Sequence, residues 1–307
     1  MSLRRQSRRS RLPSARFRQS GSQYSVREKA TPLNDALPGL ERDLSFQPIE
    51  NPNPNILSAQ QIAQYNGLGY IFPIDVFSQP EIATHRAYFD DLMNRAVAKG
   101  WSSYSINGWH RHCAEIWDLV TEPRILDCVQ DLLGEDLICW GTHYFAKMPG
   151  DGKRVSFHQD ASYWPLTPSR TVTVWLAIDD ADAANGAMQL IPRSHVHGQI
   201  DFERSTVEEQ NVLNQTVRDP LTYGDAPVTV ALRAGQMSLH TDLLLHGSDA
   251  NASNRRRCGL TMRFVSPEVR AYIGWNLKSA VVCRGKDPSA HWVHHPRPTF
   301  ERIPSPE

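Results

Sequence analysis

The chain has 307 residues with 33 basic and 33 acidic side chains, and 40% of its residues are hydrophobic. Seven arginines and no acid lie in the first 20 residues, so the rest of the chain is mildly acidic. An acidic body does not suit a nucleic-acid-binding protein, which needs a basic face. No stretch approaches the roughly 20 apolar residues of a membrane span. We therefore expect a soluble globular protein that binds neither nucleic acid nor membrane.

The first 54 residues are predicted to lie outside the folded domain. Residues 1–25 are rich in Arg and Ser and too poor in apolar residues to offset the loss of chain entropy on folding. No apolar segment follows Ser7-Arg8-Arg9, so a twin-arginine export signal is not expected, whereas an organellar transit peptide has a similar composition. Five prolines between residues 30 and 54 predict an irregular linker. This leaves residues 55–307 as a single domain.

Helical signals come first in this domain, over residues 55–136. Ser58 is a good N-cap for a helix over 59–66, which Gly67 and Gly69 would end. A short strand is expected at 70–73, and the Pro that follows Ser78 predicts a helix to about residue 98. Apolar residues at helical spacing predict a third helix over 121–134.

From residue 137 the hydrophobic period changes to 2, which is typical of strands. Gly, Asn and Ser clusters separate the strands that we expect over 137–147, 171–179, 187–191, 228–232, 237–241 and 259–265. Helices followed by many short strands predict an all-β core with helical support. The expected parts are a helical lead-in over 55–136, a barrel over 137–270 and a C-terminal extension over 271–307.

The five cysteines are odd in number, widely spaced and without a C-x-x-C pair. This pattern fits neither a disulfide framework nor a zinc ribbon. It is typical of buried, reduced thiols, so we expect a cytoplasmic protein. The sequence makes no prediction of the oligomeric state.

His158 and Asp160 form an H-x-D motif that can hold a metal ion. In a strand, side chains two residues apart emerge on the same face. A third ligand is available in His246, which opens a predicted turn 88 residues later. Two histidines and one carboxylate on one side of an octahedral metal leave three positions open, as in non-haem iron(II) oxygenases.

A second H-x-D motif, His240-Thr241-Asp242, is the alternative metal site. Its ligands would crowd onto one strand end, and no arginine would stand at the matching distance. Arg257, eleven residues after His246, can instead form a bidentate pair with a carboxylate. Its neighbours Arg255 and Arg256 are expected in a solvated charged turn.

Three segments carry a resemblance to a known family: FHQDASYW, TVTVWLAIDDADAANGAMQLIPRSH and LLLHGSDANASNRRRCGLTMRF. They resemble the phytanoyl-CoA dioxygenase family of Fe(II)- and 2-oxoglutarate-dependent oxygenases, over about residues 56–300. The resemblance implies a double-stranded β-helix, a jelly-roll barrel similar to that of cupins. It also implies a reaction that uses Fe(II), 2-oxoglutarate and O2, releases succinate and CO2, and in vitro calls for ascorbate.

The resemblance assigns roles residue by residue. The positions that match iron ligands are His158, Asp160 and His246, and those that match the holders of the distal carboxylate of 2-oxoglutarate are Arg257 and Ser248. Trp175 matches an aromatic residue of that pocket, and His143 stands where relatives often have a methionine that contacts the co-substrate. Halogenating relatives replace the carboxylate of H-x-D with a small residue. Because Asp160 is present, hydroxylation is favoured.

The substrate is expected to be a small molecule, such as an amino acid, an osmolyte, a phosphonate or a natural-product intermediate. Candidate pocket residues are aromatic walls and polar handles: Tyr163, Trp164, Trp109, His110 and His112. Two other functions remain open at this point. One is a catalytically silent jelly-roll that binds a metal or 2-oxoglutarate, and the other is a cupin-like oxygenase that does not use 2-oxoglutarate.

Overall fold

The structure is a computed structural model that describes residues 36–306, so the predicted disorder of the first 35 residues lies outside the described part. The described residues form four α-helices: α1 (Ala59–Leu68), α2 (Gln79–Val97), α3 (Ala114–Val120) and α4 (Pro123–Leu133). Capping boxes begin two of them, at Ser58 and at Ser78, as the N-cap signals predicted. The short helix α3 was not predicted, because seven residues are too few for a clear helical period.

Most strands belong to two antiparallel sheets. The six-stranded sheet has, in spatial order, β1 (Tyr70–Asp75), β10 (Gln236–Thr241), β5 (Val172–Ala177), β12 (Arg257–Val265), β2 (Leu137–Lys147) and β14 (Val281–Arg284). The four-stranded sheet has β3 (Val155–His158), β11 (His246–Ser248), β6 (Met188–Leu190) and β9 (Val228–Thr229). Neighbouring strands thus come from distant parts of the chain, which is the double-stranded β-helix topology. In the described residues, hydrogen bonds do not close the two sheets into one barrel.

Smaller elements fill the connections. Two-stranded ribbons pair β4 (Leu166–Thr167) with β13 (Arg270–Ala271) and β7 (Glu203–Arg204) with β8 (Gln215–Thr216). Single turns of 3₁₀ helix are η1 (Trp109–Arg111), η2 (Asp160–Ser162), η3 (Ala183–Asn185), η4 (Ser194–His197), η5 (Val207–Glu209), η6 (Pro220–Tyr223) and η7 (Trp275–Leu277).

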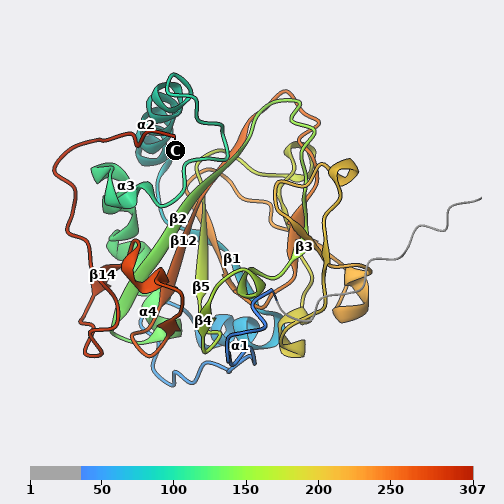
Figure 1. The fold of residues 1–307 in the computed structure, drawn as a ribbon, viewed down its shortest axis with the longest axis vertical. Coiled ribbons are helices and arrows are strands. Elements are labelled where there is room, and N and C mark those ends of the chain that lie inside the picture. Colours follow the sequence, from blue (N-terminus) through green and yellow to red (C-terminus); the bar gives the residue numbers. More distant parts are fainter. Residues whose placement is uncertain (1–35, 307) are drawn as a thin grey trace, which may run out of the picture. The chain divides into compact units, whose positions relative to one another are not determined.

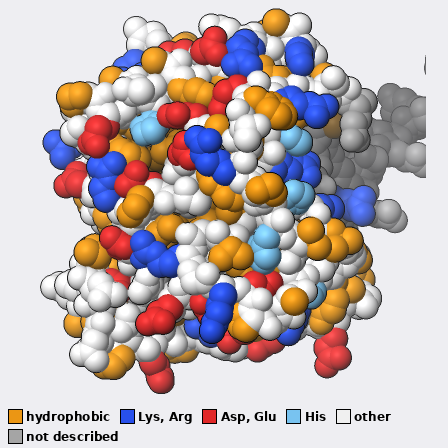
Figure 2. Space-filling view, turned by 90° about the vertical axis from the view of Figure 1, so that its left-hand side faces the viewer, with side chains coloured by type: hydrophobic (Ala, Val, Ile, Leu, Met, Phe, Trp, Pro, Cys, Tyr) orange, Lys and Arg blue, Asp and Glu red, His pale blue; other side chains and the backbone are white. Residues whose placement is uncertain are grey.

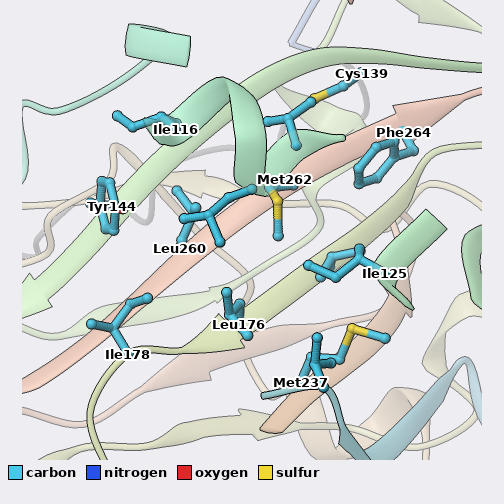
Figure 3. Packing of buried hydrophobic residues seen from close by; sticks show 14 of the residues in the cluster. Ile116, Ile125, Cys139, Tyr144, Leu176, Ile178, Met237, Leu260, Met262 and Phe264 are labelled. Carbon is cyan, nitrogen blue, oxygen red and sulfur yellow. The ribbon is translucent and has the colours of Figure 1, made fainter. Parts of the chain in front are cut away.

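The helices α2, α3 and α4 cover one face of the six-stranded sheet, where the long strands β2 and β12 run side by side (Figure 1). The main hydrophobic core lies between these two layers. Ile116 of α3 and Ile125 of α4 lie over Leu260 and Met262 of β12, as Figure 3 shows. The alternation of side chains along the strands therefore directs one set of residues into this core and leaves the other set to face the second sheet.

Several element boundaries differ from the predictions. Gly67 lies inside α1, and only Gly69, with a left-handed φ of 88°, ends it. The strand expected at 70–73 extends to Asp75, and that expected at 228–232 is only two residues long. His246-Gly247-Ser248 is strand β11, paired on both sides, and not a turn. Asp160 lies in η2, after β3 has ended, so the H-x-D motif is not wholly within a strand.

The segment 36–54 has no helix or strand, as its prolines predicted, but it is attached to the domain. Arg42 donates hydrogen bonds to the carbonyl oxygens of Ala161 and Trp164, at 2.9 and 2.7 Å. The side chain of Asn66 bonds both the N–H and the C=O of Ile49. Residues of this segment therefore reach the loop that follows β3.

Figure 2 shows the side of the molecule that the helices cover. On this face basic and acidic side chains alternate, and hydrophobic groups lie between them. Many charged side chains of the described residues are paired, as Arg297 is with Asp118 and Arg124 with Glu81. Within the described residues, no helix combines the length and the hydrophobicity that a membrane span requires.

Candidate active site

Three side chains converge between the two sheets. Nε2 of His158 and Nε2 of His246 lie 3.7 and 3.9 Å from Oδ1 of Asp160. The two imidazole rings are 4.2 Å apart at their centroids. The ligand atoms of the three residues all lie within 4.8 Å of one another, a spacing that leaves room for one metal ion between them. All three residues are buried.

The pairing of β11 with β3 explains how residues 88 positions apart meet. His246 stands directly opposite His158 in this antiparallel pair, so their side chains are cross-strand neighbours. The chain then turns into η2, which brings Asp160 beside both rings. Gly247 permits the close pairing, because a Cβ there would lie 2.8 Å from the carbonyl oxygen of Val155.

Backbone carbonyls fix the orientation of both imidazoles. Nδ1 of His158 lies 2.8 Å from the carbonyl oxygen of Ser156, and Nδ1 of His246 lies 3.0 Å from that of Leu244. A carbonyl only accepts, so each Nδ1 carries the proton and each Nε2 presents a lone pair. This is the arrangement that orients histidine ligands of metal ions.

The charges of the cluster also suit a cation. Burial opposes ionisation of Asp160, but the contact with His158 and the nearby positive groups outweigh it and hold the pKa of this carboxyl well below its usual range. Burial lowers the pKa of His246 to about 3, so this imidazole is neutral at physiological pH. Thr173 on β5 donates a hydrogen bond of 3.4 Å to Oδ2 of Asp160. A carboxylate and neutral imidazoles are the forms that bind metal.

A cavity of about 550 Å³ opens onto these three residues. Arg257, at the start of β12, lines it and is 3% exposed, yet it forms no ion pair with any described residue. Its Nε has no hydrogen-bond partner, and Nη1 makes one long bond, 3.5 Å, to the carbonyl of Phe145. A buried guanidinium with unused donors is suited to an anionic ligand.

Trp175 forms the wall beside this guanidinium. The Cζ of Arg257 lies 5.7 Å from the indole centroid, a cation–π distance. The indole can lie over β12 only because residue 259 is glycine, since a Cβ there would come within 2.1 Å of the ring. Ser248 and His143 also line the cavity. His143 directs Nε2 to the carbonyl oxygen of Tyr104 at 2.7 Å, which leaves its other ring nitrogen for a ligand.

The structure separates the expected substrate residues into two groups. Tyr163 and Trp164 line the cavity, and Tyr163 lies edge-on to His158 at 5.7 Å. His112 does not line it, because the turn η1 directs Arg111 there instead.

Two other expected pocket residues belong to the core. His110 is wholly buried, and both of its ring nitrogens have hydrogen-bond partners. Nδ1 lies 2.9 Å from the hydroxyl of Thr142, and Nε2 lies 2.7 Å from the carbonyl oxygen of Ser279. Trp109 packs edge-on against Trp101, with ring centroids 5.8 Å apart. His110 therefore has no free nitrogen for a substrate, and Trp109 is buried away from the cavity.

The second H-x-D motif does not form a comparable cluster among the described residues. Asp242 accepts a hydrogen bond of 2.8 Å from Ser169. Burial raises the pKa of Asp242 to about 7, which disfavours the ionised form that a metal needs. His240 lines the cavity 5.0 Å from the ring of His246, and neither of its nitrogens has a hydrogen-bond partner. It is a neighbour of the three-residue cluster.

The expected solvated turn of Arg255 and Arg256 is an ion-pair network. Arg255 pairs with Asp182 at 2.7 Å. Arg256 is largely buried, pairs with Asp179 and Asp90, and lies over the ring of Phe89. Because side chains alternate along β12, Arg256 faces the helix layer and Arg257 faces the cavity.

Sequence reasoning missed several cavity residues. Trp140, Arg263, Trp275 and Lys278 line the cavity and come from three regions of the chain. Only Arg263 had a usable signal, since it belongs to the predicted strand 259–265 and lies an even number of residues from Arg257. The positions of Trp275 and Lys278 depend on the irregular segment after β13.

Comparisons with known proteins agree with this geometry. The family model for phytanoyl-CoA dioxygenase (PhyH) matches residues 56–259. A probable phytanoyl-CoA dioxygenase of Caenorhabditis elegans is 24% identical over 247 residues, which cover 71% of this chain and 78% of that protein. A probable alpha-ketoglutarate-dependent hypophosphite dioxygenase of Stutzerimonas stutzeri is 27% identical over 168 residues, 54% of this chain and 58% of that protein.

Solved structures show the same fold. The non-heme monooxygenase ThoJ matches with a TM-score of 0.67 and 27% identity, over 78% of this chain and 88% of ThoJ. EctD from S. alaskensis, solved with 2-oxoglutarate and 5-hydroxyectoine, matches with a TM-score of 0.63 and 19% identity, over 82% of this chain and 89% of EctD. The predicted jelly-roll fold is thereby confirmed. With its family model spanning more than half of the sequence, the chain belongs to the phytanoyl-CoA dioxygenase family of Fe(II)- and 2-oxoglutarate-dependent oxygenases.

Proposed function

We propose that this enzyme hydroxylates a C–H bond of a small molecule, with O2 and 2-oxoglutarate as co-substrates and succinate and CO2 as co-products. The observation that carries the proposal is the shared cavity. It brings two inward-facing Nε2 atoms and one carboxylate together with a buried guanidinium that has no ion-pair partner among the described residues.

His158, Asp160 and His246 would hold the Fe(II). Their donor set, two neutral imidazoles and one carboxylate, is that of non-haem iron oxygenases and leaves positions open for other ligands. The carbonyls of Ser156 and Leu244 keep both histidines in the tautomer that this role requires. The residues present therefore fit the metal.

Arg257 would hold the distal carboxylate of 2-oxoglutarate. Its fork-shaped guanidinium matches a carboxylate with two parallel hydrogen bonds. Trp175 and Gly259 shape the wall of this end of the cavity, and Ser248 and His143 supply nearby polar groups. This end of the site distinguishes the proposed reaction from that of a cupin-like oxygenase without 2-oxoglutarate.

When bound, Fe(II) and 2-oxoglutarate supply O2 activation and the oxidising power that removes hydrogen from an unactivated C–H bond. The protein holds the reactants in place and excludes water. Tyr163 and Trp164 wall the side of the cavity beside His158 and keep it apolar there. Asp160 occupies the position that halogenating relatives leave to chloride, so hydroxyl transfer is the expected outcome.

The test is succinate release from the full chain with Fe(II), 2-oxoglutarate and ascorbate, across a panel of amino acids, osmolytes, phosphonates and natural-product intermediates. Turnover that depends on one panel member, with the product heavier by one oxygen atom, supports the proposal. If 2-oxoglutarate binds but no panel member raises succinate above the background rate of the His158→Ala variant, a silent binding module becomes the better description. If the protein oxidises a substrate without 2-oxoglutarate, the co-substrate assignment is wrong.

We place this reaction in the cytoplasm. All five cysteines are free in the structure, and four of them are buried. Buried, unpaired thiols are the usual state of cysteine in a reducing compartment. Fluorescence microscopy of the full chain with a C-terminal tag tests this placement, and import into an organelle would contradict it.

A further inference from the structure

A second arginine of β12 faces the same cavity as Arg257. Arg263 lies six residues further along the strand, an even number, so both side chains point to the same face. At a rise of about 3.3 Å per residue, their Cα atoms are about 20 Å apart. A five-carbon dicarboxylate bound to Arg257 is much shorter than this separation. The two arginines therefore mark two ends of the cavity.

The Arg263 guanidinium is enclosed by aromatic rings. Its Cζ lies 5.1 Å from the ring centroid of Trp164 and 5.8 Å from that of Trp140. The residue is 9% exposed, and its side chain makes no hydrogen bond or ion pair with any other described residue. The indole nitrogen of Trp140 is likewise buried without a partner.

An arginine in this situation is costly for the protein alone. Guanidinium stays protonated in proteins, so burial leaves a full charge. The carboxylate of Asp160 attracts this charge, but it forms no ion pair or hydrogen bond with it. The two rings offset part of this cost through cation–π attraction, but they accept none of its N–H groups in a conventional hydrogen bond. The guanidinium therefore keeps N–H groups that are free to donate to an oxyanion.

The charges around the cavity favour the same kind of ligand. Its ionisable side chains include four permanent cations, Arg111, Arg257, Arg263 and Lys278, whereas its carboxylate, Asp160, belongs to the metal cluster. Arg111 and Lys278 are exposed, and Arg111 donates a hydrogen bond of 2.6 Å to the carbonyl of Lys278. They place positive charge at the solvent side of the site, which attracts anions.

We propose that Arg263 is the specificity-determining residue of a substrate-anion subsite, and that the substrate is a small organic acid with an apolar body. Its carboxylate or phosphonate oxygens pair with the guanidinium, and its apolar body lies against Trp140, Trp164 and Tyr163. This inference rests on the proposed function, because it takes the Arg257 end of the cavity as the 2-oxoglutarate site.

The test uses three probes with the same phenyl body. They are 3-phenylpropionate, its neutral amide 3-phenylpropanamide, and 2-phenylethylphosphonate. Each is titrated calorimetrically into the full chain loaded with Ni(II), a redox-inactive substitute for Fe(II), and saturated with 2-oxoglutarate. We expect the better of the two anions to bind at least tenfold more tightly than the amide. The carboxylate and phosphonate arms show which oxyanion the subsite prefers.

Three variants locate the effect. Arg263→Met keeps the length of the side chain and removes the charge, so the preference for the anion should fall to less than threefold. Arg263→Lys keeps the charge without the planar fork and should retain an intermediate preference. Arg204→Met, at an exposed position of β7 outside the cavity, is the matched control and should behave as the wild type.

Stability supplies a second readout. Because the buried charge has no ion-pair partner among the described residues, the Met variant should melt within a few degrees of the wild type or above it. If the Met variant does not fold, the Lys variant and the comparison of acid with amide on the wild type still decide the question.

Two results would overturn the inference. One is equal binding of acid and amide by the wild type. The other is a loss of 2-oxoglutarate affinity in Arg263→Met as large as the loss of probe affinity, which would assign Arg263 to the co-substrate. A wild-type protein that binds no 2-oxoglutarate contradicts the proposed function instead. In that case the anion preference is measured on the Ni(II) form alone.

Discussion

Strand β12 has two faces that are equally buried and chemically opposite. All nine of its residues are buried. The face toward the helices carries four apolar side chains, Cys258, Leu260, Met262 and Phe264, which belong to the main core. The face toward the second sheet carries Arg257, Gly259, Thr261 and Arg263, of which the three other than glycine line the cavity.

The difference separates two reasons for burial. Leu260 and its neighbours are buried because removing apolar area from water stabilises the fold. Arg257 and Arg263 are buried although each leaves donors without partners, a condition that costs free energy. Judged only by the exposure of their side chains, both sets of residues would be counted as part of the core. Unused hydrogen-bonding capacity is what identifies the cavity face, and substitutions on the two faces should have opposite consequences.

The largest effect is expected for the metal cluster at the cavity. Substitution of His158, Asp160 or His246 by Ala removes one of three protein ligands, so succinate release should fall to background. The melting temperature without metal should fall little, because these side chains are not part of the main hydrophobic core. Activity assays measure the first effect, thermal melting of the metal-free proteins measures the second, and calorimetric titration of Mn(II) shows the loss of metal affinity.

His240 supplies the control for this prediction. It lies beside the cluster without belonging to it, so His240→Ala should remain partly active. Activity retained in two of the three cluster variants would contradict the assignment. A dead His240→Ala with an active His246→Ala would move the site to the second H-x-D motif.

On the opposite face, Leu260→Ala should act on stability. A fully buried leucine replaced by Ala costs about 2–5 kcal/mol of unfolding free energy. The cavity residues of the same strand keep their positions, so the KM for 2-oxoglutarate of the folded enzyme should change less than twofold. Denaturant unfolding and initial rates at low temperature measure the two quantities. A KM raised tenfold would show that the two faces are not independent.

Arg257→Met should instead weaken the binding of 2-oxoglutarate and change stability little. The free energy involved is smaller than that lost in Leu260→Ala. A charge-assisted pair with a carboxylate contributes about 1.5–3 kcal/mol, so the KM for 2-oxoglutarate should rise about ten- to a hundredfold. Metal affinity should not change. Arg256→Met, one residue away on the helix side, breaks the pairs with Asp179 and Asp90 and should lower stability instead. If the KM rose in Arg256→Met but not in Arg257→Met, Arg256 would be the residue that faces the cavity. The register of the strand would then be shifted by one residue.

The alternation along β12 and β5 could be read from the sequence, because burial on one face imposes a period of two. The same reasoning could not place His246 opposite His158. Register between strands 88 residues apart depends on the tertiary fold, and the short strand β11 looks like a turn when it is isolated. The resemblance to the family supplied that pairing.

The substrate end of the cavity was less predictable. His112 and Arg111 are adjacent in sequence, and which of them reaches the cavity depends on one 3₁₀ turn that no local signal predicts. Trp275 and Lys278 arrive from an irregular C-terminal segment. Partner-free groups such as Arg263 become visible only when the structure shows what surrounds them.

The last effect is a pH dependence and concerns Asp242, whose carboxyl lies just beyond β10. Burial raises its pKa to about 7 from 3.8, so the folded protein holds a proton that the unfolded chain releases between about pH 4 and 7. The contribution of this group to stability is therefore present below pH 4 and is lost as the pH rises toward 7. Asp242→Asn keeps an acceptor for Ser169 and does not titrate. The melting temperature of the wild type minus that of the variant should fall steadily from pH 4.5 to 7.5 in differential scanning calorimetry. Because the other titrating groups are common to both proteins, a difference that stays constant over this range would show that Asp242 is ionised in the folded state.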